Sequence, residues 1–75
     1  MRGDQFPREF GKMVRALRIS KGMSQEALAA SAGLHPTHIS LIESGKRCIR
    51  LTTIKQLALG LRVQPAEIMP SVKLS

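Results

Sequence analysis

Apolar residues recur along the chain at the three- and four-residue spacing of amphipathic helices, and glycines separate these segments. Phe10, Val14 and Leu17 form a stripe at i, i+4 and i+7, which predicts a helix over residues 8–20. Gly22 follows and is expected to break that helix. No segment has the pattern of a strand, so the sequence predicts an all-α fold.

The segment 24–45 predicts two short helices joined by a tight turn. Ser24 suits the N-cap of a helix over 25–32, because its hydroxyl can accept from a first-turn amide. Gly33 stands where a left-handed residue ends such a helix. A second helix over 36–44 begins with a proline, whose missing N–H costs nothing there. This arrangement is a helix-turn-helix, whose second helix can enter the major groove of DNA.

Two further helices complete a compact bundle of five short helices. The fourth is expected over 51–61, and the fifth from Gln64–Pro65 to Ile68 or Met69. The fourth helix is expected to bury Leu51, Ile54, Leu57, Ala58 and Leu61. Residues 1–7 are expected to be a flexible N-terminal arm and residues 71–75 a C-terminal tail. Residues 8–70 then form one domain.

Composition narrows the choice of partner. The 75 residues carry 12 Lys and Arg against 5 Asp and Glu, a net charge of +7 that favours a polyanion or an anionic membrane surface. The chain has no Trp or Tyr, which argues against readers that stack unpaired bases. Its single cysteine allows no intrachain disulfide, so a cytoplasmic setting is expected. No apolar run approaches the roughly 20 residues that span a bilayer.

Four segments carry a family resemblance: LRISKGMSQEALAASAG, ISLIESGKR, IKQLALGLRV and AEIM. With these motifs the chain resembles the Cro/cI-type (XRE) helix-turn-helix domains of phage repressors and small bacterial regulators, over residues 10–69. The resemblance implies a lambda-repressor-like fold and a transcriptional regulator that binds double-stranded DNA. The regulator is expected to act as a homodimer on a pseudo-palindromic operator, in the bacterial cytoplasm at the nucleoid.

Residues before and after the second helix of the helix-turn-helix, here called the second motif helix, are expected to contact DNA phosphates. Gln25 lies beside the unpaired amides at the start of its helix, and the matching family residue contacts the DNA backbone. The expected phosphate contacts are Ser24, Gln25, His35, Ser44, Lys46, Arg47, Arg50 and Thr53. The alternative is that these residues are ordinary polar groups at helix ends.

The second motif helix itself is the expected reader of base edges. Its candidates for base contacts are Thr37, His38, Ser40 and Leu41. None is Arg, Lys, Asn or Gln, the residues best suited to bidentate contacts with purines. Pro36 stands where the family often has a polar reader, and Ile49-Arg50 stands where it often has Pro-Ser.

Arg18 and Glu43 match a family ion pair, which we expect to hold the reading helix in place rather than to contact DNA. The alternative is two unrelated surface charges. Dimer contacts are expected from apolar residues near the C-terminus, which could instead only close the core of the single chain. These residues are Leu61, Val63, Ile68 and Met69.

Several functions remain to be weighed. The segment HPTHISLIESGKR is similar to that of restriction–modification controller proteins, and an antitoxin that binds both a toxin and its own promoter is the alternative. A basic peptide on a membrane surface is disfavoured by the glycine-punctuated short helices. Two histidines and a distant cysteine do not suit a metal site, and no nucleophile motif indicates an enzyme. No cofactor or small-molecule effector is expected.

Overall fold

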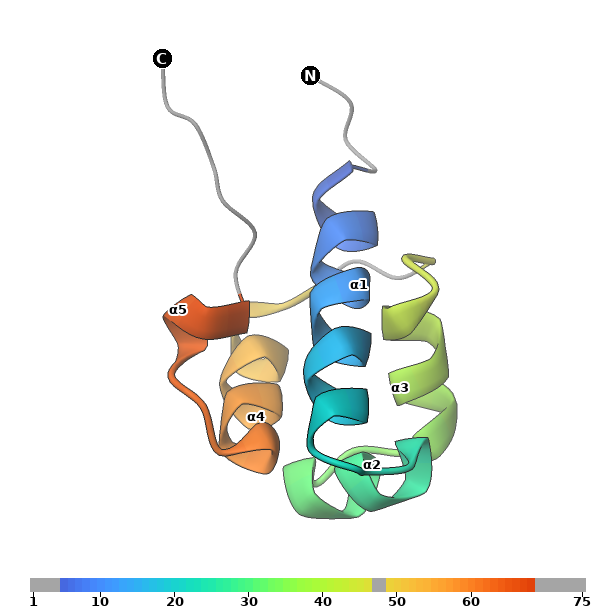
Figure 1. Cartoon of the computed structure of the whole chain (residues 1–75). Coiled ribbons are helices and arrows are strands. Elements are labelled where there is room, and N and C mark those ends of the chain that lie inside the picture. The colour runs from blue at the N-terminus through green and yellow to red at the C-terminus, as the bar shows by residue number, and fades with distance from the viewer. Residues whose placement is uncertain (1–4, 47–48, 69–75) are drawn as a thin grey trace.

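The computed structural model describes residues 5–46 and 49–68, which form an all-helical bundle (Figure 1). Its helices are α1 (Gln5–Ser20), α2 (Gln25–Ala32), α3 (Pro36–Glu43), α4 (Leu51–Leu61) and α5 (Pro65–Ile68). The five-helix fold expected from the sequence is confirmed. Among the described residues, every helix is too short or too polar to cross a membrane.

The long helix α1 runs through the middle of the bundle, with α3 along one side and α4 and α5 on the other (Figure 1). Helix α2 closes one end, where it packs against both α3 and α4. The side chains at the centre that are fully buried are Phe10, Val14, Leu28, Ile39, Ile42, Leu57, Leu61 and Ile68. Burial of each such side chain contributes about 1.5–3 kcal/mol to folding.

Helix α1 begins at Gln5, three residues before the expected start. The first four amides of a helix have no partner within it, so Pro7 can occupy the first turn without losing a hydrogen bond. Phe6 extends the apolar stripe, because its ring stacks on that of Phe10 with 5.9 Å between centroids. The expected arm over residues 1–7 is therefore wrong for residues 5–7, and residues 1–4 lie outside the described part of the chain.

The caps of the two motif helices follow the sequence signals. The Ser24 hydroxyl accepts from the amide of Ala27 at 2.9 Å, as expected for the N-cap of α2. Helices α1 to α4 all end in one motif, in which an amide donates to the carbonyl five residues back. The residue before each such amide has φ between 60° and 73°, and these residues are Gly22, Gly33, Gly45 and Arg62.

Two glycines inside helices allow neighbouring backbones to touch. A Cβ on Gly11 would overlap the carbonyl oxygen of Ile42, at the C-terminal end of α3. A Cβ on Gly60 would lie 2.8 Å from the Cβ of Ala32, where α4 crosses α2. Both helices that flank the helix-turn-helix are thus seated directly on its backbone.

Three expectations about α4 and α5 need correction. Leu51 is 75% exposed rather than buried, because it begins α4 on the face that points away from the bundle. Leu61 and Ile68 are fully buried, because α5 folds back against α1 and α4. They therefore close the core of one chain and are not available to a second chain. Val63 is half-buried against the core, and Met69 lies outside the described residues.

Candidate nucleic-acid interface

Helix α3 has one buried face and one open face. Ile39 and Ile42 point into the core with no exposed surface. On the other side, Thr37 and Ser40 are exposed and Leu41 is half-buried. The helix is thus anchored by two isoleucines and leaves short polar side chains accessible over its length. His38, the fourth candidate reader, is half-buried.

His35 has a structural task that the sequence analysis did not assign to it. Its imidazole Nδ1 accepts a hydrogen bond from the amide of Thr37 at 3.2 Å, which makes it the N-cap of α3. The bond requires an unprotonated Nδ1. Capping residues are commonly Ser, Thr, Asp or Asn, so this histidine carried no clear cap signal.

A charged network connects the start of the motif with the end of α3. Arg18 Nε donates to Glu43 Oε2 at 2.6 Å, and Arg18 Nη2 donates to Glu43 Oε1 at 3.0 Å. The same guanidinium donates to the carbonyl of Met23 at 2.8 Å. The Arg18 and Glu43 side chains are only 11% and 5% exposed. The contact expected between these two residues is therefore present, in bidentate and nearly buried form.

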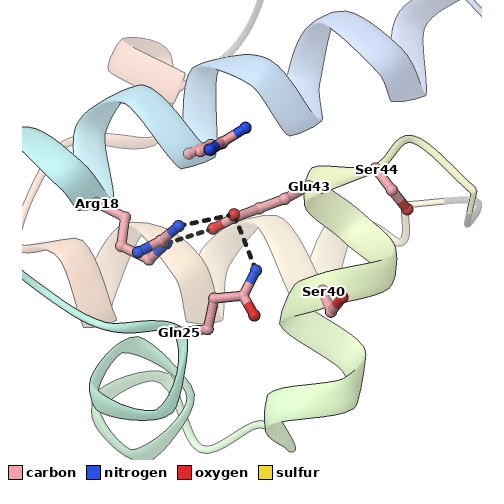
Figure 2. A pocket seen from close by; sticks show the side chains of 6 residues that line it. Arg18, Gln25, Ser40, Glu43 and Ser44 are labelled. Atoms are coloured by element: carbon pink, nitrogen blue, oxygen red, sulfur yellow. Dashed lines mark hydrogen bonds and ion pairs between the residues drawn. The ribbon is translucent and has the colours of Figure 1, made fainter.

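The hydrogen bonds to Glu43 raise the pKa of Arg18, and burial opposes this only in part. Gln25 joins the same carboxylate, because its Nε2 donates to Glu43 Oε1 at 3.2 Å (Figure 2). Both oxygens of Glu43 are consequently occupied, and its negative charge is compensated within the chain. A lone acid on α3 would otherwise repel a polyanion.

An open pocket of about 240 Å³ lies beside this network, between α1, α2 and α3 (Figure 2). It is lined by Arg15, Arg18, Gln25, Ser40, Glu43 and Ser44. The structure thus brings together an expected base reader, Ser40, with two expected phosphate contacts. Arg15 was missed by the sequence analysis. Its position three residues before Arg18, on the same side of α1, is the signal that could have found it.

The remaining expected contacts are divided by the fold. Lys46 is exposed just after α3, and Arg50 is exposed at the start of α4. Thr53 is only 6% exposed, because it shares the inward face of α4 with Ile54 and Leu57. It is therefore not available for a phosphate, and the expectation for it is wrong. Arg47 lies outside the described residues.

Comparison with known proteins agrees with this geometry. The Helix-turn-helix family model matches residues 14–68. Control protein C.BamHI of Bacillus amyloliquefaciens is 46% identical over 61 residues, which span 80% of this chain and 75% of that protein. Control protein C.MunI of a Mycoplasma species is 34% identical over 65 residues, 85% of this chain and 88% of that protein.

A solved structure is similar over most of the fold. It is the restriction-modification controller protein C.AhdI of Aeromonas hydrophila, with a TM-score of 0.82 and 38% identity. The match covers 84% of this chain and 96% of that one.

Proposed function

The chain belongs to the helix-turn-helix family of DNA-binding regulators, and we propose that it is a restriction–modification controller that binds a pseudo-palindromic operator as a homodimer. The similarity to C.BamHI and C.MunI, over most of each protein, is the observation that carries the controller role. Two copies of α3 would occupy successive major grooves about 34 Å apart. The protein is expected to act in the bacterial cytoplasm on its own or neighbouring genes.

The charges of the interface support a division between affinity and specificity. Glu43 is the one formal charge within α3, and Arg18 neutralises it. We therefore expect affinity to come from groups that flank α3, namely Gln25, Lys46 and Arg50. Contacts to phosphates hold a protein in register on DNA without reading its sequence.

Specificity is assigned to the open face of α3. Thr37 and His38 can hydrogen-bond base edges, and the Leu41 side chain can contact a thymine methyl group. Such contacts are few and weak, so we expect the shape and deformability of the operator to contribute as well.

The proposed dimer needs a surface other than the buried Leu61 and Ile68. Leu59 is 76% exposed near the end of α4, and the half-buried Val63 follows on the turn to α5. Covering apolar surface of this kind contributes about 25 cal/mol per Å². A second copy of this chain, related by two-fold symmetry, would match the symmetry of a pseudo-palindromic operator. No small-molecule effector is invoked, since the monomer–dimer equilibrium can make activity follow protein concentration.

Selection of duplexes from a random pool tests the proposal. The wild-type protein is expected to enrich an inverted repeat, and His38→Ala or Thr37→Ala to change the enriched bases while the salt dependence stays the same. A reporter gene behind the chain's own upstream region should respond to the protein if it is a controller. Enrichment of no motif, or of the same motif by all three proteins, would contradict the assigned readers.

A further inference from the structure

The pocket between α1, α2 and α3 carries a positive charge that no acidic residue within 5–46 and 49–68 neutralises. Its lining holds two arginines and one acid. Both carboxylate oxygens of Glu43 are taken by Arg18 and Gln25. Arg15 makes no hydrogen bond or ion pair with any residue in the described parts of the chain. One guanidinium therefore remains available at this pocket.

Hydrogen-bond donors of two other residues line the same pocket. Gln25 uses one amide N–H on Glu43 and keeps its second N–H. The Ser40 hydroxyl is exposed and has no hydrogen-bond partner within ranges 5–46 and 49–68. Ser44 is different, because its hydroxyl already donates to the carbonyl of Leu41 at 3.0 Å and can only accept. The available groups are thus donors with a net positive charge, which is the chemistry that binds an oxyanion.

We propose that this pocket binds one phosphate group of the DNA backbone, with Arg15 as the charged ligand and Ser40 as a second donor. The inference rests on the proposed function, because it takes the DNA to lie along α3. It also moves Ser40 from the base-reading set to the phosphate contacts. Base reading then falls to Thr37, His38 and Leu41.

Position in the fold favours a backbone phosphate over a base edge. Arg15 belongs to α1, which lies alongside α3 in the bundle (Figure 1), and only α3 is taken to enter the groove. Gln25 begins α2, so its partly positive helix end faces the same pocket. A phosphate seated there would contact three helices at once and so fix the angle between the DNA strand and α3.

Salt-dependent binding to the selected duplex and to an unrelated duplex tests the role of Arg15. Arg15→Ala is expected to weaken binding to both duplexes about tenfold for each bound copy, as the loss of one charge-assisted hydrogen bond per copy predicts. The slope of log affinity against log salt should fall by about 0.9 for each bound copy of the chain. Arg15→Lys should keep the wild-type slope. Lys55→Ala removes the same charge from the exposed face of α4 and should change neither value.

A second measurement identifies the phosphate. Single methylphosphonate substitutions remove the charge of one phosphate at a time along the operator. One position in each half-site is expected to weaken wild-type binding but to have no further effect on Arg15→Ala. If each methylphosphonate substitution weakens binding of the wild type and of Arg15→Ala equally, the pocket does not hold a backbone phosphate and the inference is wrong.

The outcomes separate this inference from the proposed function. A wild-type protein that binds no duplex specifically contradicts the proposed function. A wild-type protein that binds specifically, with an unchanged slope for Arg15→Ala, contradicts only the pocket. The pocket would instead hold a free anion if inorganic phosphate at constant ionic strength shifts the NMR signals of Arg15 and Ser40 while the methylphosphonate cycle shows no coupling.

Discussion

The junction of α1 with α3 is closely packed, whereas the corner between α4 and α5 has an unfavourable backbone conformation and an exposed apolar side chain. At the junction, Gly11 lets two backbones touch, and the Arg18–Glu43 pair is bidentate and nearly buried. At the corner, Arg62 adopts a left-handed conformation with φ of 60° that favours glycine, and Leu59 is 76% exposed. Backbone strain and exposed apolar surface are therefore found at the corner between α4 and α5 rather than at the junction that holds α3 in place.

This difference indicates which geometry matters for binding. A recognition element must be held to within about 0.5 Å and 10–20° of its productive position. The α1–α3 junction supplies that rigidity with backbone contact and a charged network, neither of which can shift gradually. The strain and exposure at the α4–α5 corner are acceptable if a second chain covers it.

The largest effect is expected from breaking the charged network. Arg18→Met should reduce the free energy of unfolding by about 3–5 kcal/mol, because it leaves the Glu43 carboxylate nearly buried without its partner. Denaturation with urea, followed by circular dichroism, measures the change. A small domain of this size has little stability in reserve, so the variant should unfold at a much lower urea concentration than the wild type.

The double variant Arg18→Met/Glu43→Met is the matched control. It should recover most of the lost stability, since an apolar pair can replace a buried ion pair. A loss below about 1 kcal/mol in the single variant would mean that the pair acts as an ordinary exposed one. The raised pKa of Arg18 predicts stabilisation that is complete below the unfolded-state pKa and is lost only as pH rises through the folded-state pKa. Titration of Arg18 therefore adds no pH dependence near neutrality.

The next effect is expected at the backbone contact. Gly11→Ala should destabilise the fold by about 1–3 kcal/mol, because the new methyl group meets the carbonyls of Ile42 and Glu43. Helix propensity alone predicts that Gly11→Ala stabilises the fold by about 1 kcal/mol. The sign of the measured change therefore shows whether the steric contact or the propensity dominates. Gly60→Ala, which meets Ala32 instead, is the control. At matched folded fraction, only Gly11→Ala should weaken DNA binding.

A smaller effect on the single chain, but a clear one on assembly, is expected at Leu59. Leu59→Ser should change the stability of the monomer by no more than about 0.5 kcal/mol, as is usual for exposed positions. It should weaken the dimer about tenfold or more. Full burial of a leucine contributes about 1.5–3 kcal/mol, and each of the two copies loses part of this energy. Sedimentation equilibrium measures this, with Leu51→Ser as the equally exposed control on the same helix. Equal effects of both substitutions would remove the proposed dimer surface.

The smallest effect is a gain at Arg62. Arg62→Gly should stabilise the chain by about 0.5–1 kcal/mol, because glycine adopts the left-handed conformation without steric cost. Arg62→Ala removes the same charge but keeps the Cβ, so it should give no gain. Thermal unfolding of the two variants separates the backbone effect from the charge. A gain in both would assign the cost to the charge of Arg62.

Expectations based on neighbours in sequence were largely confirmed, and those based on distant contacts were mixed. The capping of α2 by Ser24 and its end at Gly33 needed only the local signals that the chain displays. The Arg18–Glu43 contact came from a family pattern rather than from the residues alone. The availability of Thr53 was misjudged, because the inward face of α4 depends on how that helix packs.

By itself, the sequence determined the class of fold, the order of the helices and the helix-turn-helix, because caps, glycines and apolar spacing act within a few residues. Tertiary structure alone decided which apolar residues near the C-terminus are surface, since α5 folds back and buries Leu61 and Ile68. It also decided the pocket, because Arg15, Gln25 and Ser40 come from three helices. Side chains separated along the chain converge only when the core fixes how those helices cross.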